Sequence, residues 1–171
     1  MIRFLKNKVV YIILILVMVD QLTKVAALTF VSDGQQEIIA NVLKIGVVNN
    51  TGMAFGFAQN SNMSMIISNL VVIIIVAKFF TFQNKRLDKK MKFALPLILA
   101  GGISNLLDRI GRGYVVDYIH IGNLPIFNIA DLFVIIGWVL FALSLAIYTG
   151  KELGNIRNDG KNKKDCDQRG E

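Results

Sequence analysis

Residues 63–82 have the sequence MSMIISNLVVIIIVAKFFTF, in which Lys78 is the only charged residue. About 20 mainly apolar residues in a helix cross the hydrocarbon core of a bilayer. This stretch therefore predicts a transmembrane helix. Residues 9–30 and 130–148 meet the same criterion, and a fourth stretch at 93–109 is apolar as far as Leu107 and uses Asp108 and Arg109 to reach the interface.

The composition agrees with this pattern, since 54% of the residues are hydrophobic and the mean hydropathy is +0.53. We predict an α-helical polytopic membrane protein with four transmembrane helices in a single domain, residues 1–150. Residues 151–171 are polar and basic, and we expect a disordered cytoplasmic tail that contacts anionic lipid headgroups.

The net charge of +7 follows the ends of the predicted spans, which favours membrane topology over nucleic-acid binding. Basic residues cluster before the first span, between the second and third, and after the fourth. By the positive-inside rule these three segments, and hence both termini, are cytoplasmic. The only basic residues in the remaining loops, near residues 31–62 and 110–128, are Lys44 and Arg112. These loops are therefore expected to face outward.

The first span contains Asp20 and Lys24, which lie four residues apart and therefore on one helical face. An ion pair is the least costly way to carry both charges in a membrane helix, so we interpret them as structural. The apolar stretch continues to Phe30 without a small-residue cleavage site, which argues against a cleaved signal peptide.

The first outer loop is too long for a simple turn. Its β-branched segment Val42–Val48, followed by Asn49-Asn50-Thr51-Gly52, predicts a small β-structure on the outer surface. Met53–Phe57 mixes small and aromatic residues, which suits close approach to an apolar ligand or to the lipid interface, although a loop that only packs on the helix ends fits equally well.

Gly101, Asn105 and Arg109 recur every four residues and are expected to line one face of the third span. Glycine permits close helix packing, while Asn105 and Arg109 offer hydrogen-bond donors to a carboxylate or a substrate carbonyl. A purely structural polar seam between helices is the alternative interpretation.

Asp117 and Asp131 are acidic residues among apolar neighbours near the outer face, and such residues in a membrane protein are functional candidates. Asn128 followed by Asp131 is also typical of a capped helix start, but this does not explain Asp117. If the two carboxyl groups meet, repulsion keeps one protonated while the other is ionised. One could then activate water and the other polarise a carbonyl, with Asp131 favoured as the ionised base.

The chain resembles the lipoprotein signal peptidases, or signal peptidase II, over nearly its whole length except the tail. The resemblance rests on several motifs in order: Asp20-Gln21-Leu22-Thr23-Lys24, Asn50-Thr51-Gly52-Met53-Ala54-Phe55, Gly101 to Arg109 leading into Gly113-Tyr114-Val115-Val116-Asp117, and Phe127-Asn128-Ile129-Ala130-Asp131. It departs from the pattern at Ser104, where many members have glycine, which bears on helix packing.

The resemblance implies a bacterial intramembrane aspartic endopeptidase that cleaves diacylglyceryl-modified prolipoproteins before the lipidated cysteine. Asp117 and Asp131 match the catalytic pair of that family, and Asp20 and Lys24 match structural positions. The positions that shape or support the site are Asn50, Gly52, Ala54, Gly101, Asn105, Arg109, Asn128 and Ala130. We expect no cofactor, no metal and no nucleic acid, and a monomer that acts on lipidated substrates from within the bacterial cell membrane.

Two other classes of function are compatible with parts of the sequence. A proton-coupled transporter also carries acids in its helices, but four spans without an internal repeat fit it poorly. A scaffold subunit leaves the aspartate pair unexplained. His120, the only histidine, is interpreted as an interfacial residue, and Cys166, the only cysteine, cannot form an intrachain disulfide.

Overall fold

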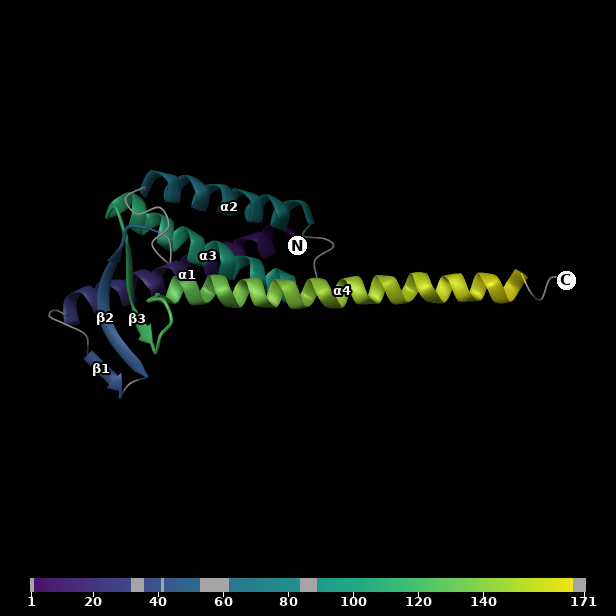
Figure 1. Ribbon diagram of the computed structural model, residues 1–171. Coiled ribbons are helices and arrows are strands. Elements are labelled where there is room, and N and C mark those ends of the chain that lie inside the picture. The colour runs from purple at the N-terminus through teal and green to yellow at the C-terminus, as the bar shows by residue number, and fades with distance from the viewer. Residues whose placement is uncertain (1, 32–35, 41, 53–61, 84–88, 168–171) are drawn as a thin grey trace.

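The computed structural model describes residues 2–31, 36–40, 42–52, 62–83 and 89–167 (Figure 1). Ala54 and the rest of the segment Met53–Phe57 lie outside these ranges. The elements, in chain order, are α1 (Ile2–Phe30), β1 (Gln36–Ile39), β2 (Leu43–Asn50), α2 (Asn62–Gln83), α3 (Lys89–Gly111), β3 (Val115–Ile121) and α4 (Ile129–Asp167).

Each predicted span is a helix. Among the described residues, the stretches long and apolar enough to cross a membrane are Lys8–Phe30, Asn62–Phe82, Lys90–Gly111 and Ile129–Gly150. Their bounds differ by a few residues from those expected, because a polar residue can continue a helix beyond the apolar core of the bilayer. The prediction of four transmembrane helices is confirmed.

The third helix is the centre of the bundle, because α1, α2 and α4 all pack against it. Within its apolar window 61% of the residues are buried, against 17% or less in the other three spans. Leu95, Ile98 and Leu99 of α3 pack against Val76 and Phe80 of α2 in one apolar cluster. Since α3 faces protein instead of lipid, it can carry polar side chains that a lipid-exposed helix could not.

Two glycines allow α3 and α4 to approach closely. A methyl group on Gly101 would collide with the backbone oxygen of Ala130 and lie 2.7 Å from Val134 Cγ2. One on Gly137 would lie 2.6 Å from Ile98 Cγ1. Small residues at helix crossings in membranes serve this purpose, and here they bring the start of α4 against the middle of α3.

The segments that join α1 to α2 and α3 to α4 form one antiparallel sheet of order β1-β2-β3. The β-structure expected in the first outer loop is present as β1 and β2. β3, from the second outer loop, was not anticipated, although Val115, Val116 and Tyr118 have high β propensity. In the register of β2 with β3, Val48 lies opposite Asp117.

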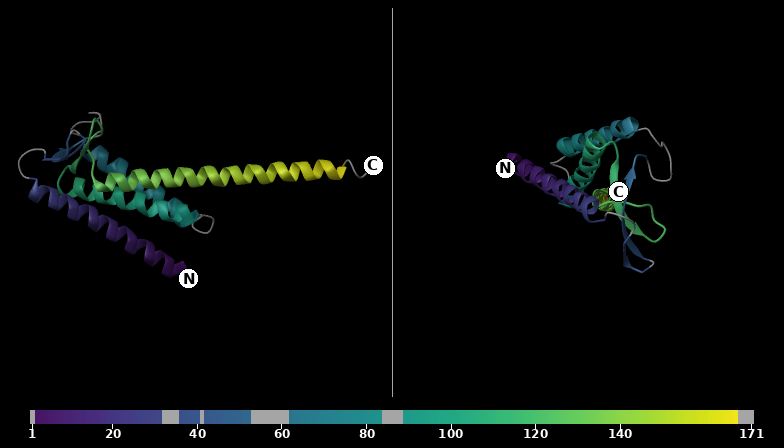
Figure 2. Two further views of the ribbon diagram at one scale, coloured as in Figure 1. Left: turned by 90° about the horizontal axis from the view of Figure 1, so that it is seen from below. Right: turned by 90° about the vertical axis from the view of Figure 1, so that its left-hand side faces the viewer.

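The sheet lies at one end of the bundle, and the first residues of α1 and the last of α4 lie toward the other (Figures 1 and 2). Ala27, near the end of α1, packs against Val116 and Tyr118 of β3 and fixes the sheet to the bundle. After α3, Gly113 has a φ of 83°, a conformation that favours glycine, and turns the chain into β3.

α4 is longer than the span predicted for it. The helix does not stop near Tyr148 but continues to Asp167. Residues 149–167 contain no proline, and they include Lys151, Glu152 and Leu153, which are good helix formers. A helix that is already nucleated in the membrane can therefore extend through this segment.

Candidate active site

Asp117 lies on β3 and is 2% exposed. Each oxygen of its carboxyl group accepts a hydrogen bond from a side-chain amide. Asn50 Nδ2 donates to Oδ2 at 2.8 Å, and Asn128 Nδ2 donates to Oδ1 at 2.6 Å. The backbone N–H of Gly52 donates to Asn50 Oδ1 at 3.0 Å, so the amide of Asn50 must present its nitrogen to Asp117.

Asp131 lies in the first turn of α4, where Asn128 caps the helix. The Asn128 side-chain oxygen accepts the N–H of Asp131 at 3.0 Å, and Asp131 Oδ2 accepts the N–H of Asn128 at 3.2 Å. This reciprocal arrangement is a capping box. The capping interpretation of Asp131 is thus correct, but it uses only one carboxyl oxygen, since Oδ1 accepts a bond from Asn105 Nδ2 of α3 at 2.8 Å.

Asn128 connects the two aspartates. Its side chain is fully buried, and it bonds Asp117 through its amide nitrogen and Asp131 through its backbone N–H and its amide oxygen. The strand that carries Asp117 and the helix that carries Asp131 are thereby held together at one residue. The geometry accounts for both acids in a way that capping alone does not.

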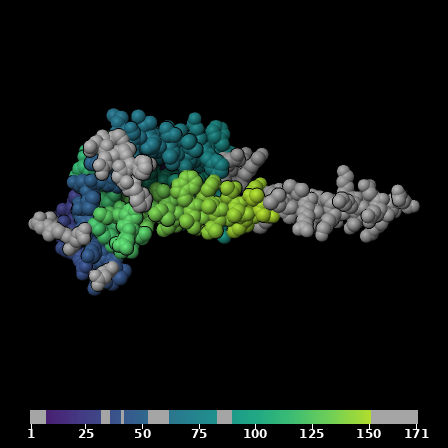
Figure 3. Space-filling view, viewed as in Figure 1, coloured from purple at the N-terminus to yellow at the C-terminus, as the bar shows by residue number. Residues whose placement is uncertain are grey.

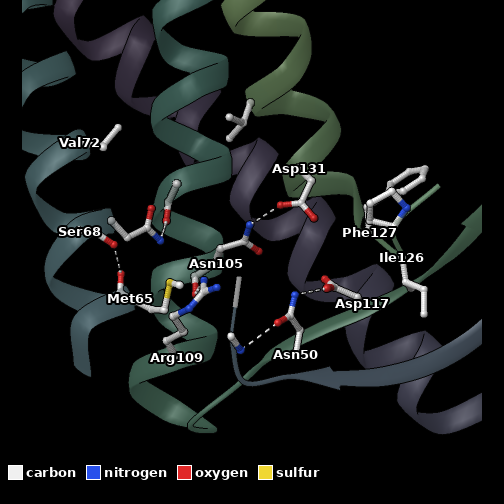
Figure 4. Close-up of a pocket in the computed structure, with 15 residues that line it drawn as sticks. Asn50, Met65, Ser68, Val72, Asn105, Arg109, Asp117, Ile126, Phe127 and Asp131 are labelled. Atoms are coloured by element: carbon white, nitrogen blue, oxygen red, sulfur yellow. Dashed lines mark hydrogen bonds between the residues drawn. The ribbon is translucent and has the colours of Figure 1, made fainter. Parts of the chain in front are cut away.

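Both aspartates line a cavity of about 510 Å³ (Figure 4). The cavity is bounded by α2, α3, the first turns of α4, the ends of β2 and β3, and the segment before α4. Its lining residues are Asn50, Gly52, Met65, Ser68, Asn69, Val72, Gly102, Asn105, Arg109, Asp117, Pro125, Ile126, Phe127, Asp131 and Val134. It combines an apolar wall with a few convergent polar groups, as ligand sites commonly do.

The Asp117 carboxyl is a weaker acid than an ordinary aspartate. Burial raises its pKa from the ordinary value of 3.8 to about 6, and the negative charge of Asp131 acts in the same direction. The hydrogen bonds from Asn50 and Asn128 and the charge of Lys24 oppose this rise. Asp117 therefore titrates close to neutral pH, where a carboxyl group can exchange protons during a reaction.

The expected stripe on α3 is present, and its members have separate environments. Gly101 packs against the first turn of α4, Asn105 bonds Asp131, and Arg109 lines the cavity. The guanidinium of Arg109 donates to its own helix at Asn105 O, at 3.5 Å. Arg109 thus remains close to the aspartates without a direct ion pair to either among the described residues.

Asp20 and Lys24 form the expected ion pair, 2.7 Å between Asp20 Oδ2 and Lys24 Nζ, and both are fully buried. The sequence did not indicate their other partner. Asp108, also fully buried, lies 2.7 Å from Lys24 Nζ through its Oδ2 and pairs with Arg112 through its Oδ1. The sequence does contain a pattern that points to Asp108. Ser104, Asp108 and Arg112 recur every four residues and so form a second polar face of α3, beside the face of Gly101, Asn105 and Arg109.

Two other side chains complete this buried network. Ser104 Oγ donates to Asp20 Oδ2 at 2.6 Å, and Gln21 Nε2 donates to Ser104 Oγ and to Asp108 Oδ1 at 2.9 and 3.0 Å. Ala130, in the first turn of α4, is fully buried and donates its N–H to Asp20 Oδ1 at 2.7 Å. His120 is half-buried on β3, with Nε2 2.8 Å from Gly46 O, away from the aspartates.

Comparison with known proteins gives a consistent result. A family model described as signal peptidase (SPase) II matches residues 12–147. The lipoprotein signal peptidase of Caldicellulosiruptor bescii is 35% identical over 134 residues, 78% of this chain and 87% of that protein. That of Shouchella clausii is 36% identical over 146 residues, 84% of this chain and 96% of that protein.

Solved structures agree with the fold. A bacterial membrane enzyme determined by the in meso method at 2.3 Å has a TM-score of 0.76 and 28% identity, and the match covers 85% of this chain and 91% of that one. A second such enzyme, determined at 1.9 Å, has a TM-score of 0.69 and 29% identity, with 81% and 92% covered. The family model, the curated relatives and the fold agree, and the chain belongs to the signal peptidase II family.

Proposed function

We propose that this protein removes the signal peptides of diacylglyceryl-modified prolipoproteins, cutting before the lipidated cysteine, and that Asp117 and Asp131 catalyse the cleavage. The observation that carries this proposal is that both carboxyl groups line one cavity and are bridged by Asn128. Two acids held at one residue, with the pKa of Asp117 raised to about 6, suit catalysis in which one carboxyl is protonated and the other ionised.

In the proposed mechanism Asp131 is the ionised base. It lies at the N-terminus of α4, where the helix dipole favours a negative charge, and it accepts a bond from Asn105, whose oxygen is held by Lys24. Asp131 takes a proton from water as the oxygen attacks the scissile carbonyl carbon. Protonated Asp117 donates to the carbonyl oxygen and stabilises the negative charge that develops there.

Collapse of the tetrahedral intermediate then breaks the peptide C–N bond. The departing nitrogen takes the proton held by Asp131, and the new carboxyl group of the signal peptide retains the water oxygen. The proton that Asp117 gave to the carbonyl oxygen returns to Asp117 as the carbonyl re-forms. Among the described residues the cavity walls offer further donors, Asn50 and Arg109, that could bind the backbone carbonyls of the substrate.

The shape of the cavity suits a substrate that arrives within the membrane. Val72 of α2 and Val134 of α4 both line it, and both helices pack on α3. The two helices meet at the rings of Phe79 and Phe141, whose centroids lie 5.6 Å apart, about two turns along each helix from Val72 and Val134. Figure 3 shows these two helices on the same face of the molecule, with the sheet at one end. An apolar signal peptide could thus approach the aspartates from the lipid, between α2 and α4.

We further propose that the protein is a monomer in the bacterial cytoplasmic membrane, with both termini in the cytoplasm and the cavity toward the outer face. The basic clusters at the ends of the spans support this orientation. The sheet end carries few of these charges, and the first residues of α1 and the last of α4 lie at the opposite end. A proton-coupled transporter fits less well, because both acids lie at one end of the bundle.

The test is cleavage of a diacylated prolipoprotein by purified protein, read as a shift in gel mobility. Asp117→Asn and Asp131→Asn should each abolish cleavage while the protein remains folded in the membrane. The control is Glu37→Gln, which removes a half-exposed carboxylate that pairs with Lys44 on the sheet, and it should cleave like the wild type. Turnover near the wild-type level in either aspartate variant would refute the mechanism. A chelator such as EDTA should have no effect.

A further inference from the structure

We propose that Lys24, with its two carboxylate partners Asp20 and Asp108, sets the separation of the two catalytic aspartates. These three residues are called the Lys24 cluster below. The inference rests on the proposed function, because it concerns how the proposed catalytic pair is positioned. None of the three lines the cavity, so their effect is exerted through other groups.

Each acid of the cluster holds the backbone next to one catalytic aspartate. Asp20 Oδ1 accepts the N–H of Ala130 at 2.7 Å, and Ala130 immediately precedes Asp131. Asp108 Oδ2 accepts the N–H of Val116 at 3.4 Å, and Val116 immediately precedes Asp117. The two anchors attach to a helix and to a strand that are distant from α1 in the sequence.

Lys24 joins these anchors. Its Nζ lies 2.7 Å from Asp20 Oδ2 and 2.7 Å from Asp108 Oδ2, and it donates to Asn105 Oδ1 at 2.9 Å. An ammonium group has three N–H donors, and here each has a partner. Because the oxygen of Asn105 faces Lys24, its nitrogen is directed to Asp131 Oδ1. Through Asp20 and Asp108, the Lys24 ammonium thus fixes the backbone beside Asp131 and Asp117. Through Asn105 it also fixes the side-chain donor to Asp131.

Burial makes the cluster rigid. Asp20, Lys24 and Asp108 are all fully buried, and charges in such a site persist only with fixed partners. Arg112, whose side chain is 28% exposed, pairs with Asp108 and balances the second negative charge. Ser104 adds a donor to Asp20. A shift of any member would leave a buried charge without its partner.

A purely structural role for the cluster makes a different prediction. If it only held the helices together, its loss would lower stability, and activity would decline only as folded protein was lost. A positioning role predicts a lower kcat in protein that is still folded. KM should change little, because the residues that line the cavity are untouched.

The principal test replaces Asp108 by Ala and Arg112 by Gln together, so that no unpaired buried charge remains. The control is Leu95→Ala, which removes a 2% exposed side chain of the same helix from the apolar cluster with α2. Cleavage kinetics and thermal melting are measured for both. The double variant should lose about 100-fold in kcat, because a displacement near 1 Å has an effect of this size. Its KM should stay within about threefold of the wild-type value. Its melting temperature should be no lower than that of Leu95→Ala.

If the double variant kept the kcat of the control, the positioning role would be refuted, while the aspartate pair would stand on its own substitutions. If it did not accumulate in the membrane, Asp108→Asn would replace it. This variant preserves volume, weakens the acceptor for the Val116 N–H and removes the negative charge that pairs with Lys24 and Arg112. This variant should lose at least about tenfold in kcat at unchanged KM, and a kcat equal to that of Leu95→Ala would refute the proposal. Full cleavage by Asp117→Asn would instead refute the proposed function.

Discussion

At the scale of single residues, Asp117 is held between opposing effects. Burial and the charge of Asp131 favour its protonated form, while two amide donors favour the ionised form. Both donors are fixed in orientation, Asn50 by Gly52 and Asn128 by Asp131. A carboxyl that titrates near pH 6 in a rigid site can act as an acid with little reorganisation of its surroundings.

This balance predicts the pH dependence of cleavage. Because the mechanism needs Asp117 protonated, kcat/KM should fall as the pH rises through about 6, the pKa of that group in the free enzyme. The profile should be measured with a substrate that has no titrating group in this range. The control is Glu37→Gln, which should keep the same descending limb. A kcat/KM that stays constant from about pH 5 to 8 would contradict the assignment of the proton to Asp117.

The same pKa predicts an effect on stability. The folded protein keeps the proton of Asp117 up to about pH 6, whereas the unfolded chain releases it near 3.8. The stability that this group contributes is therefore complete below pH 3.8 and is lost as the pH rises through about 6. Relative to Asp117→Asn, the wild type should lose up to about 3 kcal/mol of unfolding free energy between pH 4 and pH 7.

Denaturant titration of both proteins in detergent at several pH values checks this prediction. The comparison uses the difference between the two proteins, so that the other titrating groups cancel. Glu37→Gln serves again as the control, since its carboxylate is half-exposed and its removal should give no comparable change across the range. Parallel curves for the wild type and Asp117→Asn would show that burial does not perturb this carboxyl.

At the scale of elements, the crossing of α3 and α4 determines where Asp131 lies. Gly101 faces the first turn of α4, and Gly137 faces Ile98 and the backbone of Ala94 two turns further along. No side chain separates the helices at these points. The position of Asp131 relative to Asn105 thus depends on two residues that have no functional group of their own.

We predict that Gly101→Ala moves the start of α4 away from α3 and abolishes most cleavage. Its methyl group would meet backbone, which cannot move aside as a flexible side chain can, and such overpacking costs about 1 to 3 kcal/mol. Gly137→Ala should destabilise similarly but retain more activity, because it lies farther from Asp131. Activity and melting temperature of both variants distinguish these effects.

The control is Gly111→Ala at the last position of α3, where a methyl group would meet nothing within 4 Å. It should be as active as the wild type and slightly more stable, by up to about 1 kcal/mol, because alanine favours helix. Equal loss of cleavage in all three glycine variants would indicate a general sensitivity of the bundle instead of a specific crossing.

The elements also show what a sequence can and cannot reveal. Hydropathy is local, so the four spans were predictable, and β2 was predictable from its β-branched residues and the turn after it. β3 was missed because its apolar, aromatic stretch also suits the flank of a membrane span, and only pairing with β2 distinguishes the two. Asp117 and Asp131 were recognised as a pair, but the mediating role of Asn128 depends on tertiary contacts.

The Lys24 cluster shows most clearly which contacts the sequence alone cannot reveal. Asp20 and Lys24 are four residues apart, so their pairing follows from helix geometry alone. Asp108 is 84 residues from Lys24, and its position at the end of a span gave an equally good reason for it to face water. Burial of a charge is a property of the assembled bundle and cannot be inferred from neighbouring residues.

At the scale of the whole molecule, four spans place the two ends of the chain on the same side of the membrane. The first residues of α1 and the last of α4 both lie opposite the sheet (Figure 1). This arrangement leaves two possible orientations. From the distribution of basic residues we propose the one in which the sheet and the cavity face outward.

The single cysteine permits a direct test of this orientation. Cys166 lies in the C-terminal segment, so a membrane-impermeant maleimide should not label it in intact cells but should label it after lysis. In a Cys166→Ser background, Asn123→Cys in the exposed turn after β3 should be labelled from outside. Reporter fusions after Lys90 and Lys164 should likewise read cytoplasmic, and fusions near Asn60 and Asn123 external. Labelling of Cys166 in intact cells would reverse the orientation and place the cavity on the cytoplasmic side, where the proposed substrates could not reach it in their exported form.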